Sequence, residues 1–169
     1  MSNMVITTEQ LANAVGEQFR SRGWKIITAE SCTGGGLAYA LTSIAGSSGW
    51  FERGLVTYSN ISKEELLGVS PATLATFGSV SAQTAQEMAE GALHRSKAQA
   101  SIALTGIAGP EGGTLDKPVG TVWIACATTM AATQVTHHHF SGERNNIREQ
   151  SIKAALQILL NITAPAAFC

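Results

Sequence analysis

One passage near the N-terminus constrains the fold more than any other: a strand-like segment that turns through three glycines into a helical one. Residues 25–29 are rich in β-branched side chains, residues 34–36 are all glycine, and a helical pattern then runs to about residue 43. A strand that turns tightly into a helix is the building unit of α/β folds. The same turn lets main-chain N–H groups approach a ligand at a helix start, so it is also a candidate binding site.

Helical and strand-like segments alternate along most of the remaining chain. A helix is predicted over residues 8–22 and ends at Gly23, and further helices follow the capping residues Ser62 and Ser81. Strands are predicted over residues 51–58, 101–104, 121–127 and 134–140. The last two strands are close enough in sequence for an antiparallel pair. This order predicts one domain over residues 1–169, with an α/β fold: a three-layer α/β/α sandwich with a mixed, mainly parallel sheet.

Charged side chains are scarce, which excludes some partners. Only 14% of the 169 residues are charged, against about 25% in an average domain, and eleven basic and twelve acidic groups give a net charge of −1. That balance lacks the basic footprint that is typical of nucleic-acid-binding proteins. A surface with few charges is typical of a chain that another subunit partly covers, so we expect a homo-oligomer, a dimer or larger.

The sequence also argues against a membrane-bound chain, a disulfide framework and a metal site. It has no apolar run of 18 residues, and residues 1–10 lack the basic and apolar regions of a signal peptide, so we expect no membrane partner and a cytoplasmic location. His137 and His139 share a strand face but His138 does not, so we expect no metal site. The only aspartate, Asp116, lies in a predicted loop, which disfavours a Ser-His-Asp triad. The cysteines are odd in number, lack CxxC spacing and fit a reducing compartment: Cys32, Cys126 and Cys169.

The glycine-rich turn carries the hydroxyl groups of Ser31 and Thr33 and the main-chain N–H groups of Gly34 and Gly35. A phosphate, a carboxylate or a developing oxyanion would suit these donors. The alternative is a tight turn with a capping hydroxyl group. Cys32 is an alternative nucleophile, although no histidine near it in the sequence supports that role.

Two cations are predicted in the first turns of helices, where the macrodipole disfavours positive charge: Lys63 and Arg144. Each is either solvated or has another task. A desolvated lysine can serve as a general base, with Tyr58 beside it to hold or relay a proton, and an arginine can bind a phosphate. Thr105 and Gly106 begin a loop with four glycines and two prolines. They offer a hydroxyl group and main-chain amides, unless that loop is only a mobile connection.

Four of these segments, in this order, resemble the CinA C-terminal domain family, whose stand-alone members include nicotinamide-mononucleotide amidases. Gly142 and Arg144 match a further pattern at the start of a last helix, which apolar residues at helical spacing predict over about residues 144–159. The resemblance covers roughly residues 8–160. The matching stretches are residues 28–35 (TAESCTGG), 54–60 (GLVTYSN) with Lys63, 105–110 (TGIAGP) and 120–122 (GTV).

This resemblance implies a mixed-sheet α/β/α fold and an enzyme that hydrolyses the carboxamide of a pyridine mononucleotide. Nicotinamide mononucleotide would give nicotinate mononucleotide and ammonia, without a metal or an organic cofactor. Carried over by position, Ser31 is the expected nucleophile, with Lys63 and Tyr58 as its proton-handling partners. Whether Lys63 or Tyr58 is the base stays open, as does whether the turn amides hold the oxyanion or the phosphate. The residues expected to bind or support the substrate are Thr33, Gly34, Gly35, Thr105, Gly106 and Arg144.

Two other functions stay open at this point. In the first, the chain is a non-catalytic nucleotide-binding or protein-interaction module of the competence and damage-inducible type after which the family is named. In the second, it is an amidase that acts on an unrelated pyridine or amino amide by the same mechanism. Ammonia release across a panel of amides separates the three hypotheses.

Overall fold

A five-stranded mixed sheet runs through residues 6–163, the part of the chain that the computed structural model describes. The order is β2-β1-β3-β4-β5. β1 is parallel to β2 and β3, whereas β4 is antiparallel to β3 and β5. The predicted α/β fold with a mixed sheet is confirmed, and so is the antiparallel pair of β4 and β5. Parallel pairing does not predominate, because β4 also pairs antiparallel with β3, which leaves two parallel and two antiparallel pairs. The strands are β1 (Ile26–Glu30), β2 (Phe51–Val56), β3 (Ala100–Gly106), β4 (Thr121–Thr128) and β5 (Gln134–His139).

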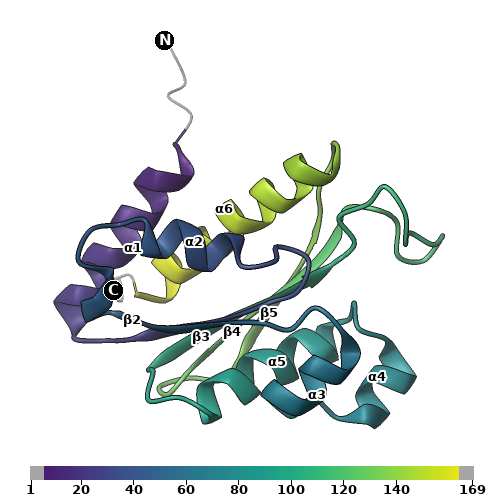
Figure 1. Ribbon diagram of the computed structural model, residues 1–169, viewed down its shortest axis with the longest axis horizontal. Coiled ribbons are helices and arrows are strands. Elements are labelled where there is room, and N and C mark those ends of the chain that lie inside the picture. Colours follow the sequence, from purple (N-terminus) through teal and green to yellow (C-terminus); the bar gives the residue numbers. More distant parts are fainter. Residues whose placement is uncertain (1–5, 164–169) are drawn as a thin grey trace, which may run out of the picture.

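Helices cover both faces of this sheet, as Figure 1 shows. On one side lie α1 (Thr8–Arg22), α2 (Gly36–Thr42) and α6 (Arg144–Thr163). On the other side lie α3 (Asn60–Leu67), α4 (Pro71–Phe77) and α5 (Ala82–His94), and the short helix η1 (Ser47–Gly49) precedes β2. Each side has its own apolar core.

The strand β1 separates the two cores. Its side chains alternate between them, with Ile26 in the core under α1 and α6 and Ile27 in the core over α5. All five residues of β1 are buried, so the strand lies inside the fold. The residue that follows β1 is therefore held by a rigid element.

Several element boundaries confirm the sequence predictions, and one corrects them. The first helix ends at Gly23, which adopts a left-handed conformation, and α5 begins after the cap Ser81. The cap of α3 is Ser59, not Ser62, because β2 ends at Val56 and lets the helix begin earlier. Lys63 is thus the fourth residue of α3 rather than a first-turn residue.

No helix within residues 6–163 is long and apolar enough to cross a bilayer. The N-terminal residues 1–5 and the C-terminal residues 164–169 lie outside the described part of the chain, and with them Cys169 and half of the segment judged for a signal peptide. The expected cytoplasmic location, single domain and homo-oligomer stay predictions.

Candidate active site

Three chemically promising segments meet at one edge of the sheet. β1, β2 and β3 run parallel, with Glu30 level with Val56 and Leu104 at their carboxyl ends. Ligands of open α/β sheets bind beyond this edge. Ser31 follows β1 directly and Tyr58 lies two residues after the end of β2, so both residues lie at this edge.

The decisive contact is between Ser31 and Lys63. Lys63 Nζ lies 3.1 Å from Ser31 Oγ, and the lysine side chain is only 1% exposed. Nζ also donates to the main-chain oxygens of Thr57 at 2.8 Å and Tyr58 at 3.3 Å. A neutral amine has two N–H groups and one lone pair. With both N–H groups on carbonyls, the lone pair is available to the Ser31 hydroxyl group.

Burial lowers the pKa of Lys63 from its ordinary value of 10.5 to about 8. The cause is desolvation, because an ammonium group out of water loses its hydration. At pH 7 about one molecule in ten then carries neutral Lys63, against about one in 3,000 for a lysine in water. The site therefore keeps a usable fraction of a strong base near neutral pH.

Close helix packing brings Lys63 to this position. Ser59 caps α3 by accepting a hydrogen bond from the Ser62 amide, which fixes where the helix begins. At its other end α3 lies against α5 at Gly91, where a Cβ atom would meet the main-chain oxygen of Leu67 at 1.8 Å. Only glycine fits there, and any side chain would push α3 and its lysine outward.

The predicted donors of the glycine-rich turn are mostly engaged within the turn itself. The Gly34 amide donates to Ser31 O, and the Gly35 amide donates to the carboxylate of Glu30. Thr33 is fully buried, and its hydroxyl group also donates to Glu30. Within residues 6–163 the amides of Cys32 and Thr33 donate to no main-chain oxygen. The structure therefore brings Thr33, Gly34 and Gly35 beside Ser31, but the predicted donors of these three residues are all engaged within the turn.

Tyr58 and Arg144 meet at the mouth of the site. Arg144, the first residue of α6, donates to Tyr58 Oη at 3.1 Å and to the main-chain oxygen of Gly109 at 2.8 Å. The Tyr58 side chain is 59% exposed. Tyr58 thus reaches Lys63 through its main-chain oxygen, whereas its phenol contacts Arg144.

A cavity of about 230 Å³ opens beside Ser31, and a second of about 580 Å³ adjoins it. The loop that begins at Thr105 and Gly106 forms one wall of the first, and Arg144 and Ala108 line both. Thr105 is buried, and its hydroxyl group donates to the main-chain oxygen of Ser79. Of the site residues predicted from sequence, five line the smaller cavity: Ser31, Tyr58, Thr105, Gly106 and Arg144. Lys63 contacts Ser31 but does not line the cavity, and neither do Thr33, Gly34 and Gly35 of the turn.

The family model of the CinA C-terminal domain matches residues 8–163. The chain belongs to the CinA C-terminal domain family. It is 49% identical over 150 residues to the nicotinamide-nucleotide amidohydrolase PncC of Escherichia coli K12, covering 89% of this chain and 91% of that protein. It is 48% identical over 151 residues to the PncC of Enterobacter agglomerans, covering 89% and 92%. The crystal structure of the competence/damage inducible protein CihA from Agrobacterium tumefaciens has a TM-score of 0.92 and 44% identity, covering 97% of this chain and all of that one.

The other candidates from the sequence lie in less favourable surroundings. Burial raises the pKa of the Cys32 thiol to about 11, so this family member keeps a neutral thiol beside Ser31 at pH 7. On β5, His137 stacks against Trp123, and His138 pairs with Thr136. Within residues 6–163 no three histidine, cysteine, aspartate or glutamate side chains gather as metal ligands would.

Sequence reasoning misses two residues of this site, Glu30 and Arg148. Glu30 is the one charged residue of β1 and precedes Ser31 directly. A carboxylate at the end of a buried strand indicates a hydrogen-bonding partner nearby, and here the amides at the start of α2 are that partner. Arg148 lies one helical turn after Arg144 and donates to the main-chain oxygen of Thr33 at 3.0 Å. Both residues hold the turn that carries Ser31.

Proposed function

We propose that this member of the CinA C-terminal domain family hydrolyses nicotinamide mononucleotide to nicotinate mononucleotide and ammonia. The observation that carries the proposal is the contact of Ser31 Oγ with the buried Lys63 Nζ, 3.1 Å apart beside a cavity. The choice of substrate is supported by the PncC relatives, which bear the name nicotinamide-nucleotide amidohydrolase and share nearly half of their residues with this chain.

Neutral Lys63 starts the first half-reaction. Its lone pair accepts the hydroxyl proton of Ser31 while Oγ attacks the carboxamide carbon, and the carbonyl oxygen becomes an oxyanion. When this intermediate collapses, the C–N bond breaks and the Lys63 ammonium group returns the proton to the leaving nitrogen. Ammonia departs, and an ester between Ser31 and the nicotinoyl group remains.

Water completes the cycle. Lys63, neutral again, accepts a proton from a water molecule that attacks the ester carbon. The C–O bond to Ser31 then breaks, and Oγ takes the proton back from Lys63. The carboxylic acid that forms ionises to nicotinate mononucleotide, so the enzyme returns to its starting state with no net proton held.

We assign the role of base to Lys63 rather than Tyr58, because Lys63 contacts Ser31 directly and the Tyr58 phenol is paired with Arg144. The main-chain amide of Cys32, which follows the nucleophile, is the preferred oxyanion donor, because an amide at that position lies beside the attacking oxygen. The Gly34 and Gly35 amides would first have to give up their present acceptors.

The two adjoining cavities suggest how the substrate lies. The carboxamide must reach Ser31, so the pyridine ring occupies the smaller cavity and the ribosyl phosphate extends toward the larger one. Arg144 lines both cavities, and its guanidinium group can bind a phosphate with two parallel hydrogen bonds. In this arrangement Thr105 and Gly106 shape the wall around the ring.

A panel of amides tests the function. We expect ammonia release from nicotinamide mononucleotide with a higher kcat/KM than from nicotinamide riboside, nicotinamide or an amino acid amide. Tight binding of the mononucleotide without ammonia release would contradict the proposal and favour the binding module. A higher kcat/KM for another amide would assign the chain to the other amidase class.

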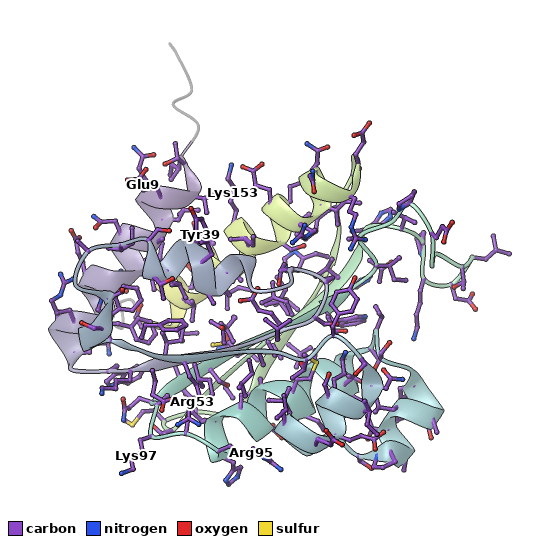
Figure 2. All side chains as sticks on the ribbon, viewed as in Figure 1. Glu9, Tyr39, Arg53, Arg95, Lys97 and Lys153 are labelled. Carbon is purple, nitrogen blue, oxygen red and sulfur yellow. The ribbon has the colours of Figure 1, made fainter. Side chains whose placement is uncertain are left out.

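Replacing Arg144 with alanine is expected to raise KM for nicotinamide mononucleotide by about 10- to 100-fold, because one charge-assisted contact to the phosphate is lost. KM for nicotinamide riboside, which lacks the phosphate, should change far less. Steady-state ammonia release with both substrates measures this difference. The matched control is Arg53→Ala, since Arg53 pairs with Glu52 on the opposite side of the sheet from α6 (Figure 2). An equal rise in KM for both substrates would show that Arg144 acts through Tyr58 and Gly109 instead.

A further inference from the structure

The carboxylate of Glu30 occupies the N-terminal end of α2. One oxygen accepts from the Ala38 amide at 2.8 Å, and the other accepts from the amides of Gly35 at 3.1 Å and Leu37 at 3.0 Å. The second oxygen also accepts from the Thr33 hydroxyl group at 2.6 Å. Four donors thus converge on a side chain that is 1% exposed.

The contacts of Glu30 hold the chain on both sides of the nucleophile, Ser31. Glu30 is the last residue of β1, and its main-chain oxygen accepts from the Thr57 amide at 2.8 Å. Its side chain points to the same side of the sheet as Ile26, toward α2. Ser31 lies between that anchored strand end and the turn that the carboxylate holds.

A helix start with free amides binds anions. Here the protein's own carboxylate fills that place, so the phosphate of a substrate finds no free donors there. The amides of Leu37 and Ala38, which would otherwise be free at the start of α2, each end on Glu30. The turn therefore holds the Glu30 carboxylate rather than a ligand. Ser31 lies in this turn, so the same contacts fix its position.

We propose that Glu30 is a positioning residue that holds the Ser31 turn in its reactive geometry and excludes the substrate phosphate from the start of α2. Arg148 assists from α6 through its hydrogen bond to the main-chain oxygen of Thr33. The proposal rests on the proposed function only for its choice of substrate. A displacement of Ser31 by about 1 Å lowers the rate of attack on the carboxamide by about 100-fold. The contacts to the rest of the substrate molecule stay intact, so its affinity changes little.

Replacing Glu30 with glutamine tests this role. The amide group keeps one acceptor oxygen and places an NH₂ group against amide donors, so the turn loses one or three of its four contacts. We expect kcat for nicotinamide mononucleotide to fall about 100-fold, KM to change by less than about threefold, and the pH dependence of kcat/KM to keep its inflection, because Lys63 is untouched.

Glu87→Gln is the matched control. Glu87 also caps a helix, by accepting from the Ser70 amide and the Thr73 hydroxyl group at the start of α4, away from Ser31. This variant should lose less stability than Glu30→Gln, because Glu87 is half-buried and accepts from two donors rather than four, and its kcat should stay within about twofold of the wild type. If Glu30→Gln lowers kcat no more than Glu87→Gln does, or raises KM instead of lowering kcat, the positioning role is overturned.

A second pair of variants covers the case in which Glu30→Gln does not fold. Thr33→Val removes one of the four donors and keeps the carboxylate, whereas Thr33→Ser keeps the hydroxyl group. We expect kcat to fall about tenfold in Thr33→Val at unchanged KM, and Thr33→Ser to restore it. A rise in KM would instead make Thr33 a substrate-binding residue, and the positioning of Ser31 through the Glu30 contacts would be overturned.

A substrate-free measurement separates this proposal from the proposed function. A fluorophosphonate reagent labels reactive serines, and the rate at which it labels Ser31 reports the geometry of Oγ without any nucleotide. Slower labelling of Glu30→Gln than of Glu87→Gln supports the positioning role even if the wild type releases no ammonia from nicotinamide mononucleotide. Equal labelling rates contradict it even if the wild type is active.

Discussion

Replacing Ser31 with alanine is expected to lower kcat for ammonia release by at least about 10⁴-fold, while nicotinamide mononucleotide still binds. Without Oγ no ester intermediate forms, and Lys63 has no hydroxyl proton to accept. The binding groups of the cavity wall, Arg144 and Thr105 among them, are unchanged. Single-turnover ammonia release measures the first effect, and titration calorimetry with the mononucleotide measures the second.

Cys32→Ala is the matched control for this variant, because it removes the neighbouring nucleophile and keeps Ser31. Burial raises the pKa of this thiol to about 11, so the thiolate is scarce at pH 7 and the variant should keep its rate within about tenfold. Normal turnover by Ser31→Ala, together with loss of turnover in Cys32→Ala, would transfer the nucleophilic role to Cys32.

The place of the site follows from the sequence because it depends on local patterns. Ser31 and Tyr58 lie at or just after the ends of strands that the sequence predicts, and parallel strands bring their carboxyl ends together. Glycines at the turn after β1 mark the close approach of strand and helix. Residue type and strand direction are enough for this much, without knowledge of any side-chain contact.

The state of each side chain depends on contacts between distant segments, and here the sequence is less informative. Lys63 is 32 residues from Ser31, and its burial depends on how closely α3 approaches α5 at Gly91. The macrodipole pointed to Lys63 as an unusual cation, but the prediction that it lies in the first turn of its helix was wrong, because the cap is Ser59. The pKa of Lys63 is lowered by burial, which depends on this packing.

The turn after β1 shows a second limit. Its glycines predict free amides for a ligand, and the same pattern arises when a buried side chain supplies the anion. Glu30 takes that place because strand alternation directs its carboxylate toward α2, which a composition of small residues cannot reveal. Gly35 is needed for its backbone conformation, with φ of 94°, rather than for a free N–H group.

Replacing Lys63 with arginine is expected to lower kcat by about 10³- to 10⁴-fold, because a guanidinium group stays charged near neutrality and has no lone pair for the Ser31 proton. Lys97→Arg, at an exposed lysine, is the matched control and should retain full activity. A Lys63→Ala variant should regain part of its rate when a small primary amine is added. Activity of Lys63→Arg close to that of the wild type would remove Lys63 as the base.

The pH dependence of the wild type should report the same group twice. Because only neutral Lys63 accepts the proton, kcat/KM should rise with pH, bend near pH 8 and level off, and this bend should vanish in Lys63→Met.

The free energy of unfolding should depend on pH through the same lysine. The pKa of Lys63 is about 8 in the folded state and 10.5 when exposed, so the unfolded chain binds more protons between these values and stability rises with pH there. The free energy of unfolding of the wild type relative to Lys63→Met should therefore increase by about 3 kcal/mol between about pH 7 and pH 11. Urea unfolding of both proteins across this range measures the difference, and a difference that does not change with pH would mean that Lys63 keeps its ordinary pKa and is charged throughout the working range of the enzyme.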